Sequence, residues 1–403
     1  MKNNYFEWIN SVKILCGDGA IENIPYELDF FHCKNPMLLS DEGLKKIGTV
    51  DRFVDMLKSV KINHIFTNIP ADSSTTTINE IVEYYKQNKC DGIIAVGGGS
   101  VIDTAKGVRM VLSQGKTDIN TLMGNENIKK GEHIPFIVVP TTCGTGSECT
   151  YVAVIKNHES GVKMEFISSE LLPDVAVVDV RMTATLPAKL TASTSMDAMV
   201  HAIEAYTSLQ KNPISDTYAI TAIKLISNNL INVLKNPNDL VGRYNLALAS
   251  TLAGIAFSNA MVGVVHAIGH ACGGVRNVPH GNAMACLLAQ CMKYNSDKVG
   301  DLYGEILLYL CGEEVFAKTP KTERCIKSIE FIENMLKQIN EITGMGITLS
   351  AYGVSEDDIE SIAKVAQNDG AIIVNKKNVP LEDIKQILQK CIWGFLWKRK
   401  KVK

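Results

Sequence analysis

The first half of the chain alternates short apolar runs with segments of helical periodicity. The apolar runs occupy residues 36–40, 64–69, 92–97 and 135–140. Helical segments begin near Asp41, Thr76 and Ser100, between successive runs. Strands that alternate with helices of this length predict βαβ units on a parallel sheet. Because the runs are apolar throughout, we expect helices to cover both faces of that sheet.

The pattern changes after residue 150. Two apolar segments on either side of the polar turn 158–161 predict a β-hairpin, and a further strand is expected at 175–180. Beyond the turn signal at 186–193, helical periodicity dominates, as in 214–236 and 326–342. The second half of the chain is therefore predicted to be helical.

These patterns divide the chain into an α/β domain with a parallel sheet, residues 1–185, and an all-α domain, residues 186–403. The total of 403 residues is long enough for two such domains, and 46% hydrophobic with 21% charged residues is typical of a globular protein. The formal net charge of −2 gives no reason to expect a nucleic acid or a membrane surface as partner.

Eleven scattered cysteines without a CxxC pair indicate reduced thiols in the cytoplasm rather than a disulfide framework. Polar residues interrupt the N-terminal segment where a signal peptide would need an apolar core. No run approaches the roughly 20 apolar residues of a membrane span. We therefore expect a soluble cytoplasmic protein with no membrane span.

Two glycine-rich segments each follow a predicted strand. In 95–107, AVGGGSVIDTAKG, three glycines precede a helix whose N-terminal N–H groups suit a diphosphate, although a tight turn would also need glycine. In 139–148, VPTTCGTGSE, hydroxyl groups are available to a nucleotide. Two such loops in succession mark the sheet edge where open α/β folds bind ligands. The chain lacks the GxxxxGK[ST] motif, which weakens a Walker-type nucleotidase interpretation.

Asp41 stands at the end of the first predicted strand, the apolar run 36–40. Its carboxylate could accept hydrogen bonds from the hydroxyls of a ribose, or it could cap the next helix. In the ribose role it would repel a 2′-phosphate and favour NAD over NADP. The sequence leaves both roles open.

Acidic and histidine side chains recur at metal-ligand spacing in the second half. Asp197 and His201 are four residues apart, and His266 and His270 repeat that spacing. His280 follows just past a proline. One carboxylate with two or three imidazoles suits a borderline divalent metal such as iron(II) or zinc. The alternative is a set of capping or core histidines.

Five motifs occur in a characteristic order: GGGSVIDTAK, PTTCGTGSE, DAMVHAIEAY, GVVHAIGHACG and VPHGNA. Together they resemble the iron-containing (group III) alcohol dehydrogenase family, and the similarity extends from about residue 10 to 391. The resemblance implies an N-terminal dinucleotide-binding domain, an all-helical metal-binding domain, and a catalytic site in the cleft between them.

The resemblance also assigns individual residues. Asp197, His201, His266 and His280 match the family's metal ligands, whereas His270 matches a nearby histidine that is usually not a ligand. The matched cofactor positions are Asp41 at the ribose, Gly97, Gly98, Gly99, Ser100 and Asp103 at the diphosphate, Thr141, Thr142, Thr145 and Ser147 along the nucleotide, and Lys163 beside the cofactor.

The function expected from these assignments is hydride transfer between NAD(H) and a small primary alcohol or aldehyde. Fe²⁺, with zinc as the alternative, would act as a Lewis acid, and His270 would relay a proton or serve as a packing histidine. Tyr151, Val152 and Phe257 flank the motifs and could form an apolar wall. We also expect a homo-oligomer, a dimer or larger.

Other functions are compatible with parts of the sequence. The nearest alternative is a related zinc-dependent polyol dehydrogenase of the glycerol dehydrogenase type. A metal-dependent synthase or phosphotransferase could use the glycine-rich loops for a phosphate ligand. The basic C-terminal tail 393–403 could serve recruitment, or it could be a solvated end with a local aromatic anchor.

Overall fold

The computed structural model describes residues 5–57, 59–123, 128–157 and 163–394. The chain forms two compact units, one of residues Ile9–Leu186 and one of Met1–Trp8 together with Pro187–Lys403. Trp8 belongs to the second unit, where its ring stacks on Tyr218 with 5.6 Å between the ring centroids. We call the units the α/β unit and the helical unit, and describe each by itself.

The α/β unit contains a parallel sheet with strand order β1-β8-β5-β4-β2-β3 in its described residues. Its strands are β1 (Lys13–Cys16), β2 (Pro36–Leu39), β3 (His64–Phe66), β4 (Gly92–Gly97), β5 (Phe136–Pro140) and β8 (Val175–Val178). The predicted parallel sheet is therefore confirmed. The sequence pattern missed β1, which is short, partly exposed and paired only with β8.

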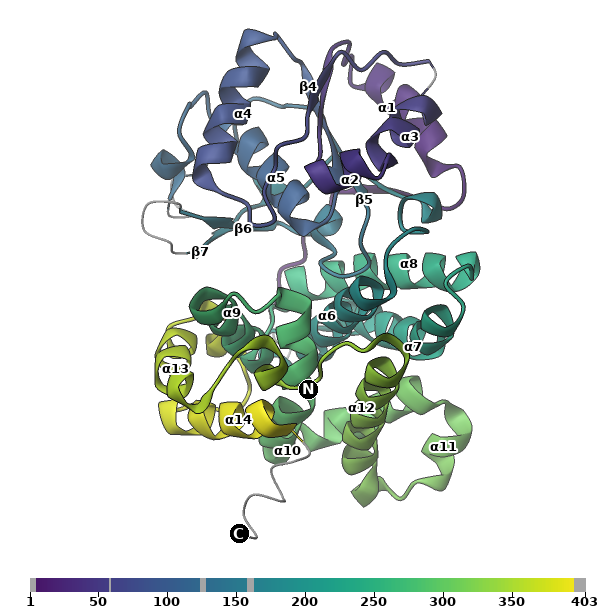
Figure 1. The fold of residues 1–403 in the computed structure, drawn as a ribbon, viewed down its shortest axis with the longest axis vertical. Helices are drawn as coiled ribbons and strands as arrows, with labels where there is room; N and C mark the ends of the chain where they lie inside the picture. Colours follow the sequence, from purple (N-terminus) through teal and green to yellow (C-terminus); the bar gives the residue numbers. More distant parts are fainter. Residues whose placement is uncertain (1–4, 58, 124–127, 158–162, 395–403) are drawn as a thin grey trace. The chain divides into compact units, whose positions relative to one another are not determined.

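Helices cover both faces of this sheet, as predicted from its apolar strands (Figure 1). The helices of the unit are α1 (Ile24–Phe30), α2 (Glu42–Lys46), α3 (Thr49–Met56), α4 (Thr75–Gln87) and α5 (Gly99–Ser113). Along β2, Met37 and Leu39 pack with α4 and α5, whereas Leu38 packs with α1 and α3. Alternate residues of one strand thus enter two separate cores, because successive side chains leave opposite faces of a sheet.

The strand order reverses between β2 and β4. The chain leaves β2 towards β3 on one side of the sheet, and it leaves β4 towards β5 on the other side. The carboxyl ends of β2 and β4 therefore flank a topological switch point, the place where open α/β sheets bind ligands. Gly98 directly follows β4, and Asp41 stands two residues after the end of β2.

The predicted hairpin is also present. Strands β6 (Val152–Lys156) and β7 (Lys163–Ile167) pair antiparallel, while the turn 158–161 lies outside the described residues. Short 3₁₀ helices complete the unit at Ala20–Asn23, Ile119–Leu122, Ser147–Cys149, Ser169–Leu171 and Val180–Met182.

The described part of the helical unit consists of helices and connecting loops. Its α-helices are α6 (Ala188–Thr207), α7 (Pro213–Lys235), α8 (Leu240–Ser258), α9 (Val264–Arg276), α10 (His280–Cys311), α11 (Glu313–Lys318), α12 (Lys321–Thr343), α13 (Ile359–Gln367) and α14 (Leu381–Trp393). Its 3₁₀ helices are η7 (Leu349–Tyr352), η8 (Glu356–Asp358) and η9 (Gly370–Val374). The helices predicted at 214–236 and 326–342 correspond to α7 and α12, so the helical second half is confirmed.

Among the described residues, one helix, α8, is long enough and apolar enough to cross a membrane by length and composition alone. The expectation that no run approaches this length was therefore wrong for residues 240–258. The helix packs against α6 and α7, and 61% of its apolar window is buried inside the protein. A core helix enclosed by neighbours needs no broad polar face, which accounts for this composition.

Candidate metal centre and nucleotide-binding edge

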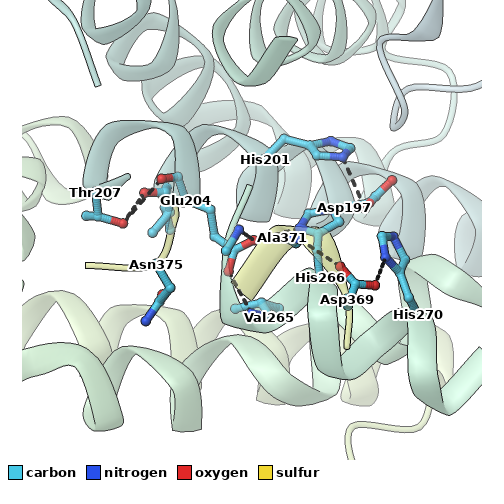
Figure 2. A network of polar contacts seen from close by, with 12 residues as sticks. Asp197, His201, Glu204, Thr207, Val265, His266, His270, Asp369, Ala371 and Asn375 are labelled. Carbon is cyan, nitrogen blue, oxygen red and sulfur yellow. Dashed lines mark hydrogen bonds and ion pairs between the residues drawn. The ribbon is translucent and has the colours of Figure 1, made fainter. Parts of the chain in front are cut away.

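Four of the predicted metal-binding side chains converge in the helical unit. Asp197 and His201 lie on α6, His266 lies on α9, and His280 is the first residue of α10. One ligand atom from each lies within 4.8 Å of the others. From Asp197 Oδ1, the Nε2 atoms lie 3.3 Å away in His280, 3.8 Å in His266 and 3.9 Å in His201. Figure 2 shows three of these four side chains directed towards a common point.

Close packing of α10 against α6 brings His280 into this cluster. A Cβ atom at Gly281 would lie 2.5 Å from the carbonyl oxygen of Ser193, a contact too short for any residue but glycine. Ser193 stands one helical turn before Asp197. The PHG sequence at 279–281 therefore starts the helix and allows the approach that places His280 beside Asp197.

The cluster has the donor set of a divalent metal site. Asp197 Oδ1 and His266 Nε2 are buried and have no hydrogen-bond partner in the described residues. Leaving such an atom unpaired costs about 1–3 kcal/mol, so a bound cation would remove a penalty that the fold otherwise carries. Three imidazoles and one carboxylate suit iron(II) or zinc.

The protonation states also suit a cation. Burial lowers the pKa of His201 to about 3, and burial likewise holds the pKa of His266 well below its usual value. Burial alone would raise the pKa of Asp197, but the neighbouring histidines outweigh it and lower that pKa. At neutral pH the imidazoles of His201 and His266 are thus neutral and Asp197 is a carboxylate, the forms that bind metals.

His270 lies beside the cluster. Its ring stacks on that of His280 with 5.4 Å between centroids, and its Nδ1 lies 2.9 Å from Asp369 Oδ2 (Figure 2). Asp369 also caps η9, where Oδ1 accepts a hydrogen bond of 2.8 Å from Ala371 N. Sequence reasoning missed Asp369, because it stands 99 residues from His270 in the chain.

A second residue that sequence reasoning missed is Glu204. It belongs to the DAMVHAIEAY motif and stands three residues after His201, which is the spacing of one helix face. Its buried carboxylate lies 2.6 Å from His266 Nδ1. Burial raises the pKa of Glu204 to about 7, and hydrogen bonds from the backbone of Gly263 and Val265 act in the opposite direction.

Of the three residues predicted to form an apolar wall, Phe257 lies in the helical unit. The Phe257 ring, on α8, stacks on His201 with 4.2 Å between centroids. An aromatic side chain therefore adjoins the metal-ligand cluster. Tyr151 and Val152 belong to the α/β unit, where both are half-buried.

In the α/β unit, the two glycine-rich loops lie side by side at the carboxyl ends of β4 and β5. Thr141 N donates a hydrogen bond of 3.0 Å to Gly97 O, which ties the start of the second loop to the end of β4. Gly98 is the N-cap of α5 and makes no side-chain cap. The helix therefore presents backbone N–H groups and the positive end of its dipole at this edge, as a diphosphate site requires.

Further contacts describe how Asp41 and Ser100 are held. Asp41 is the N-cap of α2, and its Oδ1 accepts a hydrogen bond of 2.9 Å from Leu44 N. The capping role is thus present, and the ribose role stays a prediction. The hydroxyl of Ser100 donates to the carbonyl of Ala71. Lys163 begins β7 opposite Lys156, and its side chain lies outside the described residues.

A buried lysine connects α5 to the second loop. Lys106 Nζ donates to Ser147 Oγ at 2.9 Å, to Thr150 Oγ1 at 2.8 Å and to Val152 O at 2.7 Å. Ser147 Oγ in turn donates to Asp103 Oδ1 at 2.6 Å. These contacts make Asp103 and Ser147 internal supports of the loop, and their direct contact with a cofactor stays a prediction. No local pattern in the sequence predicts this role of Lys106.

The buried charge of Lys106 should make stability depend on pH. Burial lowers its pKa from 10.5 to about 8, so above about pH 8 the unfolded chain binds more protons than the folded one, and stability rises with pH. Between about pH 7.5 and 9.5, the unfolding free energy of the wild type should gain about 2 kcal/mol relative to Lys106→Met. Denaturant unfolding followed by circular dichroism measures this. If the difference in unfolding free energy between the wild type and Lys106→Met stayed constant across this pH range, Lys106 would not be a buried group that titrates there.

Comparisons with known proteins agree with both units. Residues 11–180 match the family described as iron-containing alcohol dehydrogenase, and residues 191–392 match the C-terminal region of the Fe-containing alcohol dehydrogenase family. The NAD-dependent methanol dehydrogenase of Bacillus methanolicus is 32% identical over 93% of this chain and 97% of its own. The 1,3-propanediol dehydrogenase of Citrobacter freundii is 32% identical over 96% of this chain and 99% of its own. A crystal structure of 1,3-propanediol oxidoreductase superposes with a TM-score of 0.91 at 31% identity, covering 96% of this chain and 100% of that one.

A doubly wound α/β unit, joined in one chain to a helical unit with an Asp/His cluster, is the architecture of a metal-dependent oxidoreductase. The chain belongs to the iron-containing alcohol dehydrogenase family. It is therefore an oxidoreductase that acts on alcohols, and the recognition made from its five motifs is confirmed.

Proposed function

We propose that this protein interconverts a small primary alcohol and its aldehyde with NAD(H), using Fe²⁺ held by Asp197, His201, His266 and His280. The convergence of these four side chains, with buried ligand atoms that lack a hydrogen-bond partner, carries the proposal. The family is iron-containing by its description, which favours iron over zinc.

The proposed nucleotide site is the edge formed by the glycine-rich loops. The N-terminus of α5 would bind the diphosphate through Gly97, Gly98 and Gly99, and the hydroxyls of the second loop would follow the nucleotide. Asp41, at the end of β2 beside the switch point, would accept the ribose hydroxyls and repel a 2′-phosphate. The relative from Bacillus methanolicus is named as NAD-dependent, which supports the same preference.

The bound metal would supply Lewis-acid chemistry, lowering the pKa of the alcohol in one direction and polarising the aldehyde in the other. His270 is the proposed proton relay. The hydrogen bond of its Nδ1 to Asp369 fixes the ring, so that its other nitrogen can exchange a proton with substrate or solvent. Phe257, stacked on His201, would provide an apolar wall that suits small to medium alcohols.

The proposal is tested on protein purified without oxygen. We expect iron to dominate the metal analysis, and we expect NADH absorbance to fall when an aldehyde is added, faster than with NADPH. Butanol should outperform glycerol in the reverse reaction. Zinc with a preference for glycerol would instead support the polyol dehydrogenase, and no NADH oxidation with any aldehyde would favour the synthase or phosphotransferase. Full activity in metal-free protein would contradict the proposed role of the metal.

We also propose a cytoplasmic homo-oligomer, a dimer or larger. All eleven cysteines are free thiols, which suits a reducing compartment. Exposed apolar side chains such as Leu209 and Val241 on the helical unit offer surface for a second copy. The basic tail is outside the described residues from 395 onwards, so its recruitment role stays a prediction.

A further inference from the structure

Glu204 lies on one side of the metal-ligand cluster, where it contacts two backbone N–H groups and the His266 ring. Its Oε2 lies 2.6 Å from His266 Nδ1 and accepts a hydrogen bond of 2.8 Å from Gly263 N. Its Oε1 accepts a hydrogen bond of 2.7 Å from Val265 N. Figure 2 shows the carboxylate between the start of α9 and the His266 ring. Both oxygens therefore face N–H groups, an arrangement that suits an acceptor-only carboxylate.

This contact decides which nitrogen of His266 carries the proton. Because both Glu204 oxygens already accept backbone N–H groups, the contact at 2.6 Å favours the tautomer with the proton on Nδ1 and the lone pair on Nε2. Nε2 is the buried atom that lacks a hydrogen-bond partner in the described residues and lies 3.8 Å from Asp197 Oδ1. The lone pair is thus presented to the same point as the other ligand atoms.

We infer that Glu204 is a positioning residue, which holds His266 in the tautomer and ring orientation that bind the metal. The inference rests on the metal site of the proposed function and extends it to a residue outside the ligand set. A carboxylate hydrogen-bonded to a ligand histidine fixes its tautomer and raises its basicity. His201 differs, because its Nδ1 is buried without a hydrogen-bond partner among the described residues. Of the two buried ligand histidines, His266 is therefore the one with carboxylate support.

Glu204 also has a purely structural contact, because its bonds to Gly263 and Val265 cap the start of α9. If capping were its whole role, replacing it would lower stability without changing the tautomer of His266 or the metal affinity of the folded protein. The two roles therefore predict different measurements.

The first measurement uses the wild-type metal-free protein. Nitrogen-15 NMR of histidine-labelled protein, with the His266 signals assigned by comparison with His266→Ala, reports which ring nitrogen is protonated. We expect a proton on Nδ1. A proton on Nε2 would overturn the inference without any change to Glu204.

The second measurement compares the metal affinity of Glu204→Gln with that of the wild type, by competition between protein and chelator for Zn²⁺ and, without oxygen, for Fe²⁺. We expect affinity to fall by about 10-fold to 100-fold, because the amide cannot accept from all three N–H groups and can present its own donor to Nδ1.

Asn212→Ala is a matched control. Asn212 caps α7 through hydrogen bonds from the backbone of Ile214 and Ser215, so its loss should lower stability while leaving metal affinity unchanged. Equal affinity in Glu204→Gln and wild type, with only a lower melting temperature, would reduce Glu204 to a helix cap. If His266→Ala itself kept its metal, the proposed function would fail instead, so the two failures are distinguishable.

Discussion

Replacing His266 with alanine should remove the bound metal and lower kcat by about 1000-fold or more, while NADH affinity stays within a few-fold of the wild type. The cluster would lose one of its four converging ligand atoms, the buried Nε2 that has no hydrogen-bond partner in the described residues. A Lewis acid at the reacting oxygen contributes several kcal/mol to the transition state, which corresponds to this loss in rate. Metal analysis, steady-state kinetics and fluorescence titration with NADH measure the three quantities.

His133→Ala provides the control for this result. His133 is a histidine of the α/β unit that pairs with Asp174 at 2.9 Å and is absent from the metal-ligand cluster. Metal content and kcat should therefore be unchanged in the control. Stoichiometric iron and wild-type turnover in His266→Ala would show that the Asp/His cluster is not the metal site.

Gly99→Ala should weaken NADH binding by about 10-fold to 100-fold without loss of metal. A Cβ atom at this position would lie 2.7 Å from Thr145 Cγ2, so one of the two glycine-rich loops must shift. Overpacking of this kind costs about 1–3 kcal/mol, and here the shift falls on the N-terminus of α5, where the diphosphate is proposed to bind. Fluorescence titration with NADH measures the affinity, and metal analysis checks the cluster.

The structure supplies a rescue for this variant. Thr145→Ser removes the Cγ2 atom but keeps the hydroxyl oxygen, which accepts a hydrogen bond of 3.2 Å from Ser147 N. The double variant Gly99→Ala/Thr145→Ser should therefore recover most of the lost affinity, and Thr145→Ser alone should bind NADH nearly as the wild type does. If Gly99→Ala bound NADH as tightly as the wild type, the nucleotide would not bind at the N-terminus of α5.

The strands that the sequence predicted best are those buried on both faces. β2, β4 and β5 are apolar throughout because helices cover both sides, and their composition alone identifies them. β1 has partly exposed positions and pairs with β8 alone, so four residues carried too little pattern. For α8 the pattern was incomplete in another way, because apolar composition does not distinguish a core helix from a membrane helix.

The residues that support the candidate sites were beyond sequence reasoning for a common reason. Glu204 and His266 are 62 residues apart, Asp369 and His270 are 99 apart, and Lys106 and Ser147 are 41 apart. Each pair meets because separate elements pack together, and no local spacing records such a meeting. The one local signal was the position of Glu204, which stands on the same helix face as His201.

The sequence by itself determined the alternation of buried strands with helices, the two glycine-rich turns and the i, i+4 spacing of Asp197 and His201, because these depend on local periodicity and backbone freedom. Tertiary structure alone decided which strand ends become neighbours and that His280 approaches Asp197 to 3.3 Å. It also decided that the Glu204 carboxylate lies 2.6 Å from one imidazole nitrogen of His266. Those outcomes depend on how helices pack over long sequence distances, and burial then lowers the pKa of His201 and of His266.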